Sequence, residues 1–98
     1  MDNYQTDFNA VQKEVESLEM TLNDVADIKK KNPAGSVVQQ EFRMRQSNIK
    51  INQQMLDLEN LASEYQNSGS RFNINVQTRQ KRIDQIVNLK KKANTAQA

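Results

Sequence analysis

The chain has 98 residues, carries 14 Lys or Arg against 12 Asp or Glu, and contains no Cys, no His and no Trp. Without Cys and His it lacks a disulfide framework, a thiolate nucleophile and an imidazole base that titrates near neutral pH. With two Gly, one Pro and a mean hydropathy of -0.90, its composition argues against a β-sandwich or barrel with many tight turns.

The first predicted helix spans about residues 3–31. Its apolar residues recur at alternating spacings of four and three, a seam typical of a helix that packs on neighbouring helices. The seam consists of Tyr4, Phe8, Val11, Val15, Leu18, Leu22 and Val25. We expect Pro33 and Gly35 to end this helix, because proline disfavours a helical residue before it and glycine tolerates left-handed turns.

The second predicted helix spans about residues 37–66 and begins with a capping box, Ser36 to Gln39. Its apolar residues form two neighbouring stripes. The first stripe contains Val38, Phe42, Ile49 and Leu56. The second stripe contains Met44, Ile51, Met55, Leu58, Ala62 and Tyr65. Such a broad, two-part face predicts a middle helix that contacts two neighbours.

The third predicted helix spans about residues 75–93, with Asn75 as its N-cap and Phe72 as a plug under the preceding turn. Its looser apolar face contains Val76, Ile83, Ile86, Val87, Leu89 and Ala93. We expect residues 94–98 to form a frayed tail. Short connections between long helices predict an all-α, antiparallel up-down-up three-helix bundle over residues 1–93. A long dimeric coiled coil is the main alternative, and the two Gly-containing breaks disfavour it.

The near-neutral total hides a strong charge asymmetry. Residues 1–28 carry seven acids and one base, whereas residues 71–98 carry seven bases and one acid. The first and third helices are therefore complementary and are expected to lie side by side. In an up-down-up bundle their last turns share one end, which predicts a basic pole for an anionic membrane surface or an acidic peptide. The pole would comprise Lys29, Lys30, Lys31, Lys90, Lys91 and Lys92. The alternative is that these lysines only complement the helix C-termini and keep the surface solvated.

The residue types that remain argue against catalysis. Glu14, Glu16 and Glu19 lie on the solvated side of the first helix, and no calcium loop or phosphate-binding glycine motif accompanies them. We therefore predict no enzyme activity, cofactor, metal or small-molecule substrate. Nucleic-acid binding is disfavoured because the third helix has no stacking aromatic residue and the acidic first helix repels phosphates. An interaction module remains.

A resemblance to a known family suggests which kind of interaction module this chain is. The segment Asp57-Leu58-Glu59, the turn Arg71 to Asn75 and the later Arg82 resemble the N-terminal domain of the syntaxin-6 group of Qc-SNAREs. That group has an acidic-Leu-acidic segment at the end of its second helix, a basic-Phe-Asn-Leu-Asp turn, and an Arg within its third helix. The syntaxin-8 group and Qb-SNARE N-terminal bundles remain open as alternatives.

The resemblance implies a regulatory domain in vesicle fusion at the trans-Golgi network and endosomes. Its partners would be other SNAREs and tethering-complex subunits, on the cytosolic face of those membranes. The SNARE motif and membrane anchor would lie outside these 98 residues. We expect the partner to dock in a groove around Lys50, Arg79 and Arg82. The alternative is a helical structural or adaptor subunit of an unrelated complex, whose third helix packs on a partner chain.

Overall fold

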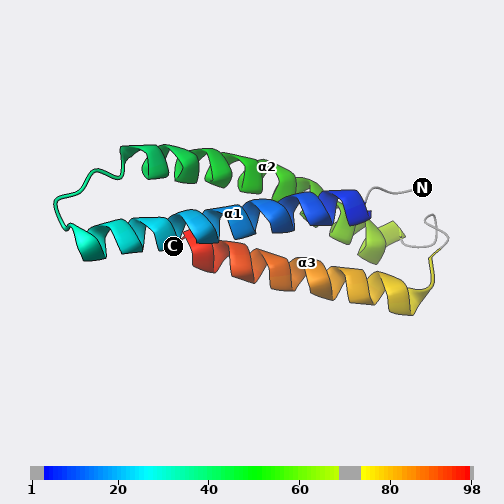
Figure 1. The fold of residues 1–98 in the computed structure, drawn as a ribbon. Coiled ribbons are helices and arrows are strands. Elements are labelled where there is room, and N and C mark those ends of the chain that lie inside the picture. Colours follow the sequence, from blue (N-terminus) through cyan, green and yellow to red (C-terminus); the bar gives the residue numbers. More distant parts are fainter. Residues whose placement is uncertain (1–3, 69–73, 98) are drawn as a thin grey trace.

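The computed structural model describes residues 4–68 and 74–97, which form three helices packed side by side (Figure 1). They are α1 (Tyr4–Lys31), α2 (Val38–Ser68) and α3 (Val76–Gln97), and no strand occurs in the described ranges. The bundle is elongated, with principal extents of 56 × 18 × 17 Å. The predicted all-helical fold of three helices is thus confirmed. The Phe72 prediction falls outside the described residues.

The core lies along the line where the three helices meet. Its largest fully buried side chains come from α1 and α2 and are Val11, Val15, Leu18, Ile51 and Leu58. The contribution of α3 consists of Ile83, Ile86, Leu89, Ala93 and Ala96. Each α1 residue in this core belongs to the predicted heptad seam, because a four-three spacing returns to the same side of a helix. Phe8 and Leu22, also in the seam, are half-buried against the same cluster.

The turn between α1 and α2 is tight. The backbone N–H of Gly35 donates to the carbonyl of Asn32 at 2.8 Å, and the N–H of Ala34 donates to the Asn32 side chain at 3.3 Å. A Cβ on Gly35 would lie 3.0 Å from the Asn32 carbonyl oxygen and 3.2 Å from Ile28 Cγ2. The close packing of the turn on the end of α1 favours glycine here, whereas the left-handed backbone that the sequence suggested is not present.

The predicted N-cap is confirmed for α3 and is wrong for α2. Helix α3 has the expected cap, since the Asn75 side chain accepts a hydrogen bond from the N–H of Thr78 at 2.7 Å. Helix α2 begins one residue later than the Ser36 capping box requires. The carbonyl of Val37, which is buried, accepts the N–H of Glu41 at 2.9 Å, so Val37 occupies the N-cap position.

The expected frayed tail is wrong for residues 94–97, because α3 continues to Gln97. Ala93 and Ala96 are buried there, and the side-chain amide of Gln97 donates to the Asn52 side chain at 3.1 Å. Three apolar or small residues at helical spacing, Leu89, Ala93 and Ala96, extend the inward face of α3. Alanine buries little surface but lets the helix approach its neighbours closely.

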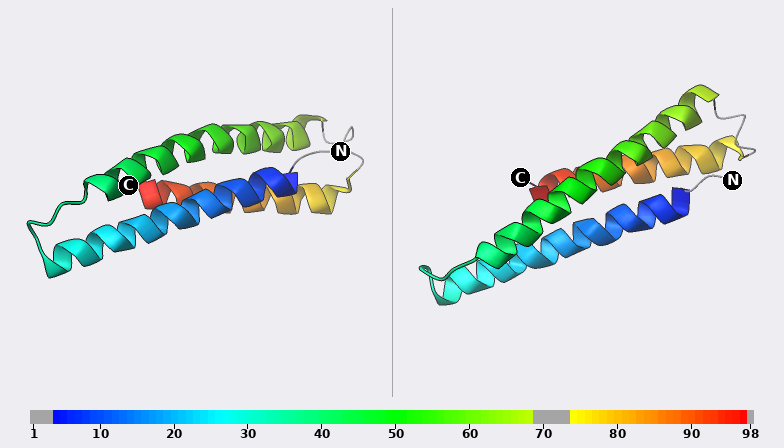
Figure 2. Two further views of the ribbon diagram at one scale, coloured as in Figure 1. Left: turned by 45° about the horizontal axis from the view of Figure 1, so that its top comes forward. Right: turned by 90° about the horizontal axis from the view of Figure 1, so that it is seen from above.

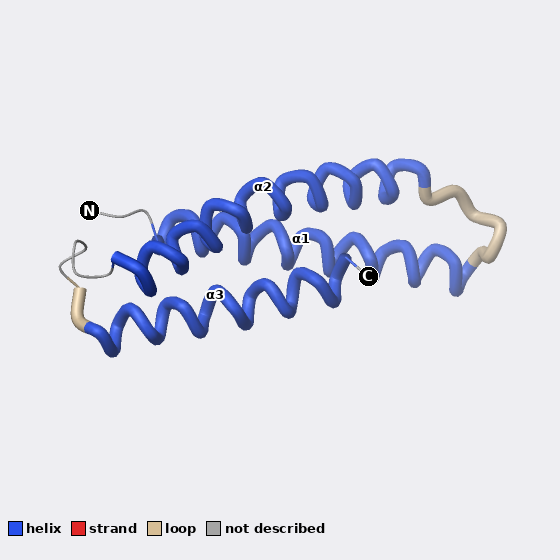
Figure 3. The backbone as a smooth tube through the Cα atoms, turned by 180° about the vertical axis from the view of Figure 1, so that it is seen from behind, coloured by secondary structure: helices blue, strands red, loops and turns tan. Residues whose placement is uncertain are grey.

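Beyond the level of Gln97, α1 and α2 pack only on each other within the described chain (Figures 1 and 3). Gln97 contacts Asn52, which lies 14 residues after Val38, the first residue of α2. At a rise of 1.5 Å per residue, this two-helix arm is therefore about 21 Å long. Two small polar side chains, Thr21 of α1 and Ser47 of α2, are buried, at 6% and 4% exposure. The Thr21 hydroxyl donates to the Ser17 carbonyl one turn earlier, so its polar group is satisfied.

Candidate functional site

Helix α2 carries a row of large apolar side chains on its solvent side. The row, which we call the α2 outer stripe, consists of Val38, Phe42, Ile49 and Leu56, and these side chains are 66%, 54%, 57% and 59% exposed. They lie four, seven and seven residues apart, so they line one face of the helix over about 27 Å. Isolated exposed apolar residues are ordinary in proteins, but a row of them along one face of a helix is a feature of interaction surfaces.

The structure confirms that α2 contacts both other helices, but it does not bury both apolar stripes as the predicted two-part face implied. Only the second stripe faces the core, where Ile51, Met55, Leu58 and Tyr65 are buried. In Figure 2 (left) α2 lies along one edge of the bundle, with α1 and α3 together on its other side. Both neighbours therefore contact the same side of α2, and the first stripe stays in solvent.

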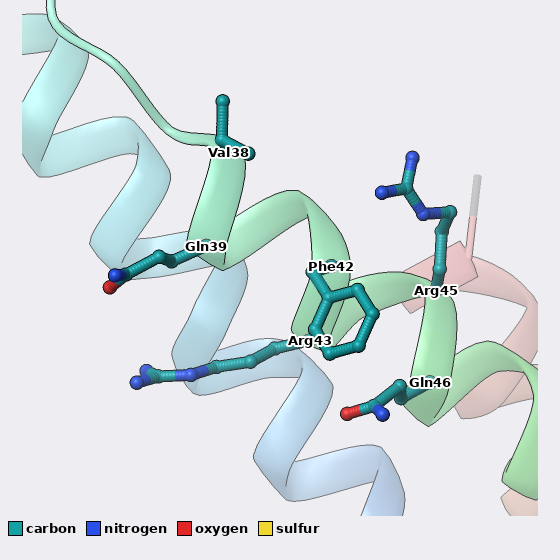
Figure 4. A pocket seen from close by; sticks show the side chains of 6 residues that line it. All are labelled: Val38, Gln39, Phe42, Arg43, Arg45 and Gln46. Atoms are coloured by element: carbon teal, nitrogen blue, oxygen red, sulfur yellow. The ribbon is translucent and has the colours of Figure 1, made fainter.

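The N-terminal end of the α2 outer stripe contains an open hollow of about 550 Å³. Figure 4 shows the Phe42 ring in its centre, with the guanidinium groups of Arg43 and Arg45 extending to opposite sides. Val38, Gln39 and Gln46 complete the lining. An apolar ring between two cations suits a partner that combines an apolar side chain with nearby carboxylates.

The three residues predicted to surround a docking groove do not form one surface. Lys50 is exposed on α2, and it lies 15 residues, or about 22 Å, from Tyr65 along the helix. Arg82 contacts that tyrosine: its guanidinium donates to the Tyr65 hydroxyl at 2.9 Å. Arg79 is half-buried and donates to the carbonyl of Ile74 at 3.1 Å. Both arginines are thus committed to contacts within the bundle.

Arg82 lies between two tyrosines from different helices. Its guanidinium carbon is 4.7 Å from the ring centroid of Tyr4 and 5.9 Å from that of Tyr65. The Tyr4 hydroxyl donates to the Gln85 side chain, and its ring stacks on Phe8 with centroids 5.6 Å apart. Burial raises the pKa of Tyr4, and the positive charge of Arg82 partly opposes this shift. This cluster joins all three helices at one end of the bundle.

The predicted basic pole is not assembled at one level. Lys90 forms an ion pair with Glu59 at 2.9 Å, and Lys92 forms one with Glu19 at 3.5 Å. Lys29 lies ten residues beyond Glu19, a rise of about 15 Å along α1. The triplet at residues 29–31 is exposed at the end of the two-helix arm, whereas α3 stops short of that end. The Lys92–Glu19 pair does join acidic α1 to basic α3, as the charge asymmetry suggested.

The acidic residues of α1 lie at or near the surface. Glu16 is exposed, Glu14 is half-buried, and the ranges 4–68 and 74–97 contain no group of three or more acidic residues that could hold a metal ion. None of the helices in these ranges is long and apolar enough to cross a membrane.

Comparisons with known proteins identify no relative of this chain. No family model, no curated protein and no solved structure matches it. The α2 outer stripe was the feature that sequence reasoning assigned to the wrong environment. Its signal was present, because Phe42, Ile49 and Leu56 form a strict seven-residue repeat separate from the core repeat of the same helix.

Proposed function

We propose that this chain is an antiparallel up-down-up three-helix bundle that acts as a protein-interaction module and catalyses no reaction. The observation that carries this proposal is the α2 outer stripe, with every one of its four large apolar side chains more than half exposed. Contact between such a row and water is unfavourable, so a partner that covers the row forms a complex stabilised by the burial of apolar surface. An amphipathic helix is the partner shape that fits a straight row along a helix.

The more specific proposal is the regulatory N-terminal domain of a SNARE, similar to the syntaxin-6 group. Its partners are tethering-complex subunits and other SNAREs, at the cytosolic face of trans-Golgi and endosomal membranes. The positions that carry the resemblance support it through their packing. Leu58 is fully buried in the core, and two contacts join α2 to α3: Glu59 pairs with Lys90, and Arg82 binds Tyr65. A related bundle needs the same residue types for the same contacts.

The gene context tests the SNARE proposal. A SNARE requires, after this bundle, about 60 residues of heptads with a central glutamine and then an apolar segment of about 20 residues. Sequencing the complete transcript decides the matter. A transcript without heptads and an apolar segment downstream removes the SNARE proposal and leaves the interaction module.

Binding to purified partners tests the interaction surface. Tethering-complex subunits and SNARE motifs are titrated by calorimetry against the chain and against a variant with Ile49→Gln and Leu56→Gln. Both side chains are exposed, so the variant keeps its core. We expect at least a tenfold loss of affinity, about 1.4 kcal/mol. Met20→Gln, at a 68% exposed apolar residue of α1, is the matched control and should bind normally. Equal affinity of all three proteins would show that the stripe does not bind these partners.

A helical structural or adaptor subunit of another complex is the second candidate. It is favoured by two apolar residues of α3, Val76 and Val87, which are 68% and 46% exposed. In that case α3 packs on a partner chain in a stable assembly. Native purification of the tagged chain separates the candidates, because a structural subunit co-purifies in fixed stoichiometry through high-salt washes. A regulatory domain exchanges its partners and elutes largely alone.

A further inference from the structure

A row of charged residues runs beside the α2 outer stripe and changes sign halfway along the helix. The row consists of Arg43, Lys50, Asp57 and Glu64, spaced seven residues apart. Its first three members each follow a stripe residue by one position, so the row flanks the stripe. All four side chains are exposed, and no ion pair in the described part of the chain engages them. The stripe is therefore bordered by positive charge in its first half and negative charge in its second.

We infer that the α2 outer stripe binds the same stripe of a second copy of this chain, with the two α2 helices antiparallel. The inference rests on the proposed role of the stripe as a docking surface and names its occupant. When Ile49 lies opposite Leu56 of the second copy, Lys50 lies two residues, or about 3 Å along the helix axis, from the level of the second copy's Asp57. Two apolar contacts and two opposite-charge contacts form, because a two-fold axis repeats each of them.

The same register pairs the ends of the charged row. Arg43 then lies two residues from the level of Glu64 of the second copy. On the opposite flank of the stripe, Arg45 lies near the level of the second copy's Glu59, which also pairs with Lys90 in its own chain. A parallel arrangement would instead bring basic residues beside basic ones and acidic beside acidic. Charge therefore selects the antiparallel pair over the parallel pair.

The charge pattern also favours a second copy over the simplest alternative occupant of the stripe, an acidic amphipathic peptide. Such a peptide suits the hollow around Phe42, between Arg43 and Arg45. Along the second half of the stripe it would meet Asp57 and Glu64, which repel it. Only an occupant with the opposite gradient of charge satisfies the entire row, and α2 turned end for end carries that gradient.

The interface is open to a second copy and small. Neither of the other two described helices covers the outer side of α2 (Figure 2). One large apolar residue every seven positions buries less area than a standard interface, which requires about 1,600 Å². The pair should therefore be a weak, reversible dimer with a dissociation constant in the range of about 0.1–1 mM.

Analytical ultracentrifugation of the 98-residue chain tests this inference. We expect monomer–dimer exchange as the concentration approaches about 1 mM, weaker at high salt because the flanking charges are exposed. Two double variants, Arg43→Glu with Lys50→Glu and Asp57→Lys with Glu64→Lys, give rows of a single sign. Each alone should self-associate at least tenfold more weakly than the natural chain.

The decisive measurement mixes the two double variants. An acidic row and a basic row are complementary in the antiparallel pair, so the mixture should restore a dimer at least as strong as the natural one. A mixture that stays monomeric, or a natural chain that is monomeric at 1 mM, overturns the inference. Lys13→Glu with Lys81→Glu, at exposed positions of α1 and α3, is the matched control and should dimerise normally. Circular dichroism melts confirm that each variant is folded.

The dimer and the proposed SNARE function can fail independently of each other, and the experiments distinguish the two failures. A chain that remains monomeric yet loses affinity for tethering subunits with Ile49→Gln and Leu56→Gln overturns only the dimer. A chain that dimerises through charge-complementary mixing but binds neither tethering subunits nor SNARE motifs overturns only the specific SNARE proposal.

Discussion

The guanidinium of Arg82 donates a hydrogen bond to the hydroxyl of Tyr65 while lying over the ring of Tyr4, so one side chain of α3 joins both other helices. Arginine suits this position because its flat cation can stack on a ring and donate in its own plane at once. The contact also explains why Arg82 cannot be both a structural residue and a freely available docking residue.

Removing Arg82 should destabilise the bundle. Arg82→Met keeps the apolar stem but loses the hydrogen bond and the cation–π contacts with the two tyrosines. We expect the free energy of unfolding in urea to fall by about 2 kcal/mol. Lys81→Ala, at the exposed neighbouring position, should change it by less than about 0.5 kcal/mol. Equal effects of the two substitutions would mean that the Arg82 contacts contribute no stability.

The buried Tyr4 should make stability fall in alkaline solution. Its pKa is raised above the ordinary value of 10.0 by burial, so the folded chain holds this proton more tightly than the unfolded chain does. That contribution is complete below pH 10 and is lost as the pH rises from there through the folded-state pKa. Urea titrations from pH 8 to 11 should show a steeper loss for the natural chain than for Tyr4→Phe. Parallel pH profiles would contradict the raised pKa.

The two leucines on opposite sides of α2 provide a matched pair. Leu58 is fully buried and Leu56 is 59% exposed. Leu58→Ala should lower the free energy of unfolding by about 2–5 kcal/mol, because it leaves a cavity in the core. Leu56→Ala should lower it by less than about 1 kcal/mol. A large loss from Leu56→Ala in thermal or urea unfolding would place the α2 outer stripe inside the bundle.

The Asn75 cap should stabilise the start of α3. Asn75→Ala removes the acceptor of the Thr78 N–H and should cost about 1 kcal/mol. Asn75→Asp and Asn75→Ser retain an oxygen acceptor and should cost much less. Chemical denaturation measures all three variants, and hydrogen exchange of the Thr78 amide locates the change. Normal protection of that amide in Asn75→Ala would rule out the cap as its partner.

Vesicle binding should depend more on the lysines of α1 than on those of α3. Lys90 and Lys92 form ion pairs with Glu59 and Glu19, whereas the lysines at 29–31 are exposed at the end of the two-helix arm. Replacing residues 29–31 by glutamine should reduce sedimentation with phosphatidylserine vesicles at low salt, at about 1 kcal/mol per lysine. The same change at residues 90–92 should have a smaller effect. The reverse order, or no salt-sensitive binding, would refute a membrane role for the α1 lysines.

The three helices and the cap of α3 followed from local patterns, whereas the cap of α2 and the relations between helices did not. The seam from Tyr4 to Leu18 and the Asn75 cap depend on residues within a few positions of one another. The role of Arg82 and the separation of the two lysine clusters depend on contacts between distant parts of the chain. Periodicity shows that a helix has an apolar face, but it carries no information about the axial level at which neighbouring helices end.

The amino-acid sequence by itself determined that this protein is three helices with an acidic first helix and a basic third, because residue spacing and helix-ending signals act locally. Only the tertiary structure decided which apolar stripe of α2 is buried and which is left in solvent. Both stripes satisfy helical periodicity equally well, and α1 and α3 cover only one of them. The stripe they leave exposed is the surface on which the proposed function rests.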